Sequence, residues 1–285
     1  MLRRLSSRNT LQYCTRLATT RFMCNNGAEK FLEVTHKNGV REITLSHAKT
    51  LNSLSMPMMC QLQEALSKDQ DAVDLRCIVL SAQGKVWSAG HNLKELASCE
   101  SSARAEVFQQ LSDVIMDIRK LPVPVIAKVN GYAAAAGCQL VASCDLVVCT
   151  DTSKFSTPGA SVGIFCNTPG VAISRVMTHP KSAYMLMTGL PISGEEAYIA
   201  GLVTKVVPEQ ELDATITEIT CAIKSKSRSV ISLGKEFYYK QQQMPIEQAY
   251  AAAQAKMVEN MQMDDCKEGI KSFFEKRPPE WTHKN

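Results

Sequence analysis

The spacing of apolar positions divides the chain into two parts. Between residues 31 and 208, short apolar runs typical of strands alternate with segments of helical spacing. From Glu209 onward only helical spacing appears, over residues 209–226, 229–243, 246–262 and 265–277. The pattern predicts a mixed α/β core over residues 27–208 and a helical C-terminal region over residues 209–285.

The strongest single elements lie in the first half of the core. Two strand-like segments of mixed apolar and polar residues, 31–37 and 40–45, flank Asn38-Gly39, the preferred turn dipeptide of a β-hairpin. Helices are predicted over 56–67 and 104–121, because apolar residues recur there every three or four positions. Apolar runs at 77–80, 122–129 and 146–149 predict buried strands.

The second half of the core contains more chain-breaking residues. A loop is predicted over 158–169, followed by a helix over 171–187 that breaks at Pro180. Ser193, with Glu196 three positions later, predicts the start of another helix, and 205–208 predicts a short closing strand. In the C-terminal region, Asp265 with Glu268 three positions later predicts the start of the last helix.

A run of small residues after the strand at 122–129 is the most informative stretch. Residues 133–137 are four alanines and a glycine, and 133–140 has high helix propensity. Small side chains let the backbone approach a ligand, and the start of a helix offers unpaired N–H groups to an oxyanion. Tight packing of a helix on a sheet would use the same residues, so both interpretations stay open.

A second small-residue turn follows the strand at 77–80. It reads Ser88-Ala89-Gly90-His91 and opens a polar segment. Two such turns can each direct one N–H at a common point. That arrangement would hold a thioester carbonyl oxygen as it gains negative charge.

Several motifs occur in a fixed order along most of the chain, from about residue 31 to residue 281. They are Leu51-Asn52-Ser53-Leu54, Ser88-Ala89-Gly90, Val129-Asn130-Gly131-Tyr132, Gly137-Cys138-Gln139-Leu140, Cys144-Asp145, Thr188-Gly189, Ala200-Gly201-Leu202-Val203 and Glu268-Gly269-Ile270 with Phe273 and Glu275-Lys276-Arg277. With these motifs the chain resembles the crotonase (enoyl-CoA hydratase/isomerase) superfamily. The resemblance implies a right-handed spiral of ββα turns, followed by a C-terminal helical oligomerisation region that forms trimers or dimers of trimers.

The resemblance also implies the site. It places the two oxyanion donors at the backbone N–H groups of His91 and Ala136, and Ala136 keeps its donor if its φ is negative. The family's hydratases use two glutamates as acid and base, and Gln139 and Gly159 stand at those positions here. Gln does not titrate near neutral pH and Gly has no side chain, so little or no ordinary hydratase activity is expected. Glutamates at both positions are expected to raise it.

The expected ligand is an acyl-CoA thioester, with coenzyme A as part of the ligand and no tightly bound cofactor. Lys94, Phe273 and Lys276 match family positions that contact coenzyme A or line its channel, Lys276 often from a neighbouring subunit. The alternatives are solvated lysines and a core phenylalanine. The His91 side chain is expected to fill space or contact coenzyme A, and Cys138 to be a small buried residue.

The N-terminal residues differ from the rest of the chain in charge and composition. The net charge is +4, and residues 1–28 hold five arginines and no acidic residue. This composition is typical of a mitochondrial transit peptide, which is predicted over 1–26. Removal of its five positive charges changes the net charge from +4 to −1, and a net charge of −1 argues against nucleic-acid binding. A basic tail that binds nucleic acid or anionic membrane is the alternative.

The rest of the composition excludes other classes. No apolar run is long enough for a membrane span, and the 11 cysteines and five histidines do not cluster, so no metal site is predicted. A mitochondrial matrix protein of fatty-acid and acyl-CoA metabolism is expected. Two roles stay open: an enzyme that stabilises a thioester enolate or oxyanion, for example in decarboxylation or thioester hydrolysis, and a non-catalytic acyl-CoA binding or regulatory oligomer.

Overall fold

The computed structural model describes residues 29–284, and the predicted transit peptide over 1–26 lies outside the described residues. The larger sheet has the strand order β1-β2-β3-β5-β7-β10. Its strands are β1 (Leu32–Lys37), β2 (Val40–Leu45), β3 (Cys77–Ala82), β5 (Val125–Val129), β7 (Leu146–Thr150) and β10 (Lys205–Val207). Strands β1 and β2 form the predicted antiparallel hairpin, and every other neighbouring pair is parallel.

A smaller sheet accompanies the first and has the order β4-β6-β8-β9. Its strands are β4 (Val86–Ser88), β6 (Tyr132–Ala134), β8 (Lys154–Ser156) and β9 (Ile192–Ser193). The chain runs from a strand of the larger sheet to a strand of the smaller one and then into helix, three times in succession. This confirms the predicted spiral of ββα turns.

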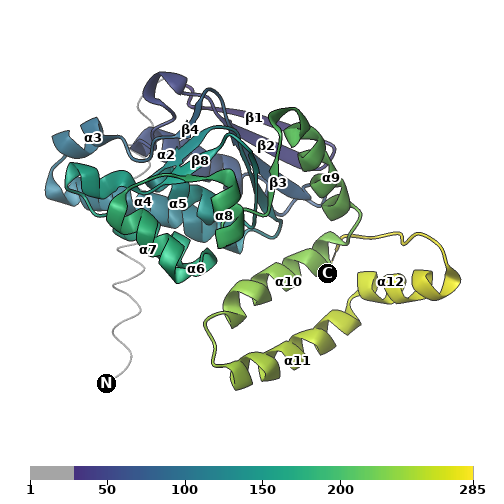
Figure 1. The fold of residues 1–285 in the computed structure, drawn as a ribbon. Coiled ribbons are helices and arrows are strands. Elements are labelled where there is room, and N and C mark those ends of the chain that lie inside the picture. Colours follow the sequence, from purple (N-terminus) through teal and green to yellow (C-terminus); the bar gives the residue numbers. More distant parts are fainter. Residues whose placement is uncertain (1–28, 285) are drawn as a thin grey trace.

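The helices of the core cover the sheets (Figure 1). They are α2 (Met56–Ser67), α3 (Leu93–Ser98), α4 (Ser101–Lys120), α5 (Ala136–Ala142), α6 (Asn167–Val176), α7 (His179–Thr188) and α8 (Gly194–Ala200), with single 3-10 turns η1 (Ala48–Thr50), η2 (Pro158–Val162) and η3 (Glu209–Glu211). The apolar stripes predicted for α2 and α4 are buried in the main core. Ser193 and Glu196 form the predicted capping box of α8.

Two core predictions were wrong in detail. The chain breaks between α6 and α7, and Pro180 stands in the first turn of α7, where its missing N–H needs no partner. The helix predicted from residue 133 begins at Ala136 instead. Residues 132–134 form β6, because pairing with β4 and β8 outweighs the helix propensity of alanine.

The C-terminal region is helical, as predicted, with four helices: α9 (Leu212–Lys224), α10 (Arg228–Gln241), α11 (Ile246–Gln262) and α12 (Asp264–Glu275). Helix α9 packs on the larger sheet, where Leu212 and Ile216 form a second apolar cluster with residues of β3, β5 and β7. Helices α10, α11 and α12 extend away from the spiral (Figure 1). Helix α11 buries none of its side chains within the chain.

Helix α10 is attached to the core through a buried ion pair. The Lys235 ammonium donates hydrogen bonds to the carbonyl oxygens of Ile118 and Val123, both at 2.9 Å, and to Asp145 Oδ2 at 2.6 Å. Tyr239 donates to Asp145 Oδ1 at 2.6 Å. Asp145 therefore has a structural role, as the acceptor that holds α10 to the core.

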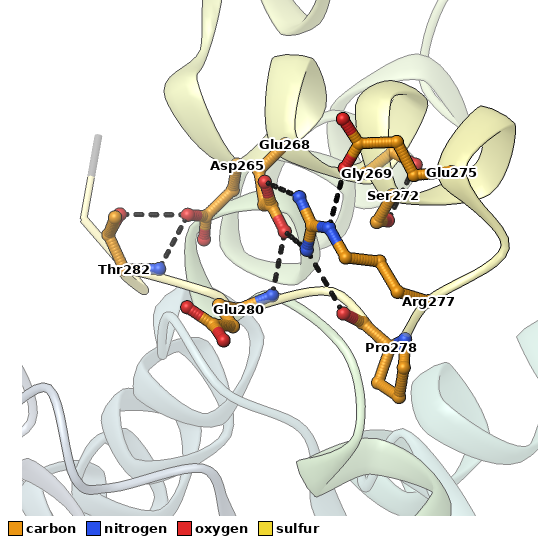
Figure 2. Close-up of polar contacts among 9 residues, drawn as sticks. All are labelled: Asp265, Glu268, Gly269, Ser272, Glu275, Arg277, Pro278, Glu280 and Thr282. Carbon is orange, nitrogen blue, oxygen red and sulfur yellow. Dashed lines mark hydrogen bonds and ion pairs between the residues drawn. The ribbon is translucent and has the colours of Figure 1, made fainter.

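The C-terminal tail folds back on α12 (Figure 2). Arg277 forms a two-pronged ion pair with Glu268, with N–O distances of 2.6 and 2.9 Å. Asp265 does not cap α12 as predicted, because Met263 is the N-cap residue. The Asp265 carboxylate is buried and accepts hydrogen bonds from Ser227 and from the backbone and hydroxyl of Thr282. The predicted capping role of Asp265 was therefore wrong.

Candidate functional site

The carboxyl ends of three parallel strands of the smaller sheet meet at one edge. The register pairs Ser88 of β4 with Ala133 of β6, and Ala134 with Ser156 of β8. The segments that follow these strands therefore lie side by side. They are 89–91, 135–139 and 157–159, and they include both small-residue turns found in the sequence.

The two turns touch at Gly90. Its φ is +89°, and a Cβ atom there would lie 3.0 Å from the backbone nitrogen of Ala136, the Cβ of Ala135 and the carbonyl oxygen of Ala134. Glycine is needed at this position for both reasons. The turn is fixed from the other side, because Leu54 N–H donates to the Gly90 carbonyl at 2.7 Å and the Ser88 hydroxyl donates to the Asn52 carbonyl at 2.8 Å.

The backbone at Ala136 keeps its donor free. Ala136 is the first residue of α5 and has no positive φ, which meets the condition set from the sequence. The unusual conformation falls one residue earlier, at Ala135, with φ +49° and ψ −118°. Such a conformation costs an L residue about 1–3 kcal/mol. It is held by bonds from Ala135 N–H to the Ser156 carbonyl and from Gln139 N–H to the Ala135 carbonyl.

The backbone amides of His91 and Ala136 are alike in their hydrogen bonding. Within residues 29–284, neither N–H donates a hydrogen bond. Unpaired backbone N–H groups are rare in protein interiors, and Ala136 is 1% exposed. Two unpaired N–H donors on touching turns can both donate to one oxygen placed between them.

Tight packing, the other interpretation of the small residues, also holds at Gly137. A Cβ atom there would lie 2.6 Å from the Ser88 carbonyl oxygen and 2.7 Å from the Ser88 Cβ. Helix α5 is buried over its whole length. The alanine and glycine run thus serves helix packing and the candidate site together.

Three polar side chains at this edge are buried without partners. They contribute the Oε1 atom of Gln139, the Oγ1 atom of Thr157 and both ring nitrogens of His91, one of which lies near the Leu54 backbone without forming a hydrogen bond of good geometry. The His91 ring packs edge-on against Phe108 of α4, with 5.2 Å between ring centroids. Sequence analysis missed Thr157. Its one signal is its place directly before Pro158, at the start of the breaker-rich loop.

The ionisable groups here are held neutral by burial. Burial lowers the pKa of His91 to about 4, so its imidazole is uncharged at physiological pH. Burial raises the pKa of the Cys138 thiol to about 12, so it is not a thiolate. Cys138 therefore lacks the thiolate form of an activated nucleophile, and the low pKa of His91 makes its neutral imidazole a weak general base.

Gly159 is a packed position as well as a missing carboxylate. A Cβ atom there would overlap the carbonyl oxygen of Ile164 and lie 2.7 Å from Cys166 Sγ. The Ile164 N–H donates to the Gly159 carbonyl at 2.9 Å, and the Gly159 N–H donates to Cys166 Sγ at 3.3 Å. The 160–166 segment therefore occupies the space that a side chain at 159 would need.

The structure separates the three residues assigned to coenzyme A. Lys94 is exposed in the first turn of α3, three residues from His91. Phe273 is 78% exposed on α12, and Lys276 ends that helix with a φ of +55°. Helices α3 and α12 lie on opposite sides of the chain (Figure 1). Phe273 and Lys276 are not brought to the site of their own chain, and their role beside a neighbouring subunit stays a prediction.

Two further classes of site were sought in the described part of the chain. Within residues 29–284, no group of three or more His, Cys, Asp or Glu side chains is arranged to bind a metal ion. None of the helices in that range combines the length and apolar character needed to cross a bilayer.

Comparison with known proteins gives a consistent result. The Enoyl-CoA hydratase/isomerase family profile matches residues 35–284. The human protein named "Enoyl-CoA hydratase domain-containing protein 3, mitochondrial" is 50% identical over 247 residues, which cover 86% of this chain and 82% of the relative. Carnitinyl-CoA dehydratase of Escherichia coli is 31% identical, over 88% of this chain and 97% of the relative.

Solved structures agree. The crystal structure of the human domain-containing protein 3 superposes with a TM-score of 0.87 at 48% identity, covering 88% of this chain and 100% of that one. An enoyl-CoA hydratase from Mycobacterium smegmatis superposes with a TM-score of 0.86 at 41% identity, covering 89% and 99%. With the ββα spiral, the paired small-residue turns and a profile match over nearly all the described residues, this chain belongs to the enoyl-CoA hydratase/isomerase family.

Proposed function

We propose that the protein binds acyl-CoA thioesters and holds the thioester carbonyl oxygen with the N–H groups of His91 and Ala136. The observation that carries this proposal is the contact of the two turns at Gly90, with both amides left unpaired. A carbonyl oxygen has two lone pairs and can accept both donors. Lys94, close to the first turn, can contact the coenzyme A part of the ligand.

The same site is unsuited to ordinary hydration of an enoyl thioester. Hydration needs one group to activate water and another to protonate the α-carbon, and each typically contributes about 10²–10⁴-fold. Gln139 cannot take either role, and Gly159 has no room for a side chain that could. We infer that ordinary hydratase activity is absent or very low.

The surrounding residues favour binding without catalysis. Segments 88–91, 132–139 and 156–160 contain no Asp, Glu, Lys or Arg. His91 and Cys138 are held in their neutral forms by burial. A non-catalytic acyl-CoA binding or regulatory role fits this set best. The enzymatic alternative, for example decarboxylation, requires only stabilisation of the enolate that forms, and product analysis separates the two.

Assembly and location complete the proposal. Helices α11 and α12 expose large apolar side chains, with Tyr250 68% and Phe274 77% exposed. We infer that a homotrimer or dimer of trimers covers them, and that Phe273 and Lys276 reach the site of a neighbouring subunit. The arginine-rich segment 1–26 and the mitochondrial name of the human relative favour the mitochondrial matrix, and hence a role in fatty-acid and acyl-CoA metabolism.

Isothermal titration of the protein lacking residues 1–26 tests the proposal. Acetyl-, butyryl- and crotonyl-CoA are compared with free coenzyme A, and mass spectrometry of each mixture detects any product. Thioesters are expected to bind more tightly than free coenzyme A, without conversion of crotonyl-CoA. Failure of every thioester to bind would refute the proposal, and turnover would support the enzymatic alternative.

A matched pair of variants isolates the contact between the turns. Gly90→Ala places a Cβ atom 3.0 Å from the Ala136 nitrogen and is expected to weaken thioester binding by about tenfold or more. Gly84→Ala is the control, because Gly84 has the same φ of +89° but its Cβ would meet only the Ala48 Cβ, at 3.4 Å. Equal effects of the two substitutions on binding would mean that the contact has no part in it.

A further inference from the structure

The turn that carries the His91 amide is held by residues 51–54, which we call the supporting segment. This segment lies beside the end of β4, and Leu54 pairs with His91 as an isolated parallel bridge. Two backbone hydrogen bonds join the segment to the turn: Leu54 N–H to the Gly90 carbonyl at 2.7 Å, and Ala89 N–H to the Leu51 carbonyl at 3.0 Å. The position of the turn therefore depends on the supporting segment.

Asn52 fixes the supporting segment to both ends of β4. Asn52 is fully buried, and its side-chain oxygen and nitrogen both have partners. The oxygen Oδ1 accepts a hydrogen bond from His47 N–H at 2.9 Å. The nitrogen Nδ2 donates to the carbonyl oxygens of Gln83 and Val86, both at 2.9 Å, so it holds the start of β4. The Asn52 carbonyl accepts from the Ser88 hydroxyl at 2.8 Å and holds the end of the same strand.

The backbone at Asn52 narrows the choice of residue further. Leu51 and Asn52 both lie in the left-handed region, with φ values of +55° and +50°. Glycine, asparagine and aspartate adopt this region more readily than other residues. Of these three, only asparagine has both an acceptor and donors in its side chain. The local conformation and the three side-chain bonds together therefore favour asparagine at position 52.

The two oxyanion donors are held by different parts of the structure. The Ala136 amide follows Ala135, whose N–H donates to the Ser156 carbonyl of β8. The His91 amide belongs to the turn that the supporting segment holds. The aim of one donor relative to the other therefore depends on this segment. Because hydrogen bonds weaken steeply with poor angles, a small displacement of the turn would remove the first donor from the thioester oxygen.

We propose that Asn52 is a positioning residue that directs the His91 N–H at the thioester oxygen. This inference rests on the proposed acyl-CoA binding function and adds the residue on which the alignment of the first donor depends. Asn52 acts indirectly, through β4 and the turn that follows it. Loss of its side chain is expected to weaken the hold on the thioester carbonyl and to leave the contacts with the rest of coenzyme A in place.

Asn52→Gly is the variant that tests this role. Glycine adopts the positive φ of Asn52 without strain but cannot replace its three side-chain bonds. Isothermal titration of the protein lacking residues 1–26 compares butyryl-CoA with free coenzyme A, which has no thioester carbonyl. The ratio of the two affinities is expected to fall by about threefold or more in Asn52→Gly, because one hydrogen bond to the carbonyl is lost. The affinity for free coenzyme A is expected to change little.

Infrared difference spectroscopy gives a readout that a loss of stability alone would not change. Butyryl-CoA with an isotopically labelled carbonyl carbon is bound to each protein, and the carbonyl band of the bound thioester is recorded. Hydrogen bonds to a carbonyl oxygen lower its stretching frequency. The band is therefore expected at a lower frequency in the parent protein than in Asn52→Gly.

Two control variants separate positioning from general effects. Asn38→Gly makes the same substitution at a similar φ of +52°, in the exposed turn of the β1–β2 hairpin. Ser153→Ala removes a buried hydroxyl that donates to the Val129 carbonyl and accepts from Gly131 N–H, at the far end of β6 and β8 from the site. Both controls are expected to keep the affinity ratio and the carbonyl band of the parent. Thermal melting shows whether each variant is folded.

A second variant keeps the test decisive if Asn52→Gly does not fold. Ser88→Ala removes the hydroxyl that donates to the Asn52 carbonyl, and it is expected to change the ratio and the band in the same direction but less. An unchanged ratio and band in Ser88→Ala would then overturn the positioning role.

The outcomes separate this inference from the proposed function. A folded Asn52→Gly variant with the ratio and the band of the parent would overturn the positioning role and leave the proposed function standing. An equal change in Ser153→Ala would show a general effect of destabilisation and would overturn the role too. Failure of the parent protein to bind butyryl-CoA or any other thioester would overturn both.

Discussion

Replacement of Gly159 by alanine is expected to destabilise the protein, although it adds only one methyl group. The new Cβ atom would overlap the Ile164 carbonyl oxygen and press on Cys166 Sγ at 2.7 Å. Overpacking of this kind costs about 1–3 kcal/mol. Movement of the 160–166 segment would also strain the bonds from Ile164 N–H to the Gly159 carbonyl and from Gly159 N–H to Cys166 Sγ, about 1 kcal/mol each.

The net effect is smaller than that sum. Alanine restricts the unfolded chain more than glycine does, which offsets about 0.4–1 kcal/mol. We expect a loss of about 2–5 kcal/mol in the free energy of unfolding, measured by urea denaturation at fixed protein concentration. Gly170→Ala on α6 is the control, because its Cβ would meet only the flexible end of Leu186, at 3.4 Å. That variant is expected to be neutral or slightly stabilised.

This prediction bears directly on function. Glutamates at positions 139 and 159 can raise hydratase activity only if there is room for a carboxylate side chain at position 159. Because backbone fills that place, Gln139→Glu with Gly159→Glu is expected to yield a destabilised protein without hydratase activity. A Gly159→Ala variant as stable as the parent, or a double variant that hydrates crotonyl-CoA, would show that the 160–166 segment yields easily and would refute the reasoning.

Two other predictions follow from buried groups. Lys235→Met leaves Asp145 and two carbonyl oxygens without their cation and is expected to cost about 3–5 kcal/mol of unfolding free energy. The control is Lys205→Met, in the exposed pair with Glu218, which is expected to cost at most about 1 kcal/mol. Similar losses in the two variants would contradict the assigned role of Lys235. His91 has a pKa of about 4 in the folded state against about 6.5 when unfolded, so its contribution of roughly 3 kcal/mol to the free energy of unfolding is present above pH 6.5 and is lost as the pH falls toward 4. NMR titration of the imidazole checks the pKa, and His91→Gln is expected to lack this pH-dependent loss of stability. An imidazole signal that titrates near pH 6.5 would contradict the prediction.

Long periodic elements could be predicted from the sequence, whereas short paired ones could not. The hairpin and α2 each show several repeats of their period, and both were found. The strands of the smaller sheet have two or three residues, too few to show an alternation. Their existence depends on pairing with partners more than 20 residues away along the chain, for example Tyr132 with Lys154.

The candidate site, too, could be predicted from the sequence only where the signal is local. The two small-residue turns were visible in the sequence, because glycine and alanine runs after strands are a local signal. The blocked space at Gly159 was not, because it depends on how the 160–166 segment folds back. Thr157 gave no signal beyond its place before a proline, since what distinguishes it is burial without a partner. Asp265 looked like a helix cap because its partners, Ser227 and Thr282, lie far away in the sequence.

Helix α11 places a condition on any measurement of this protein. It has 17 residues and buries none of them within the chain, while Ile246 and Val258 are 72% and 64% exposed. Tertiary packing supplies most of the stability of protein helices, and this helix has little of its own. If other copies of the chain supply that packing, dilution will loosen α11, and the midpoint of thermal unfolding will rise with protein concentration by mass action.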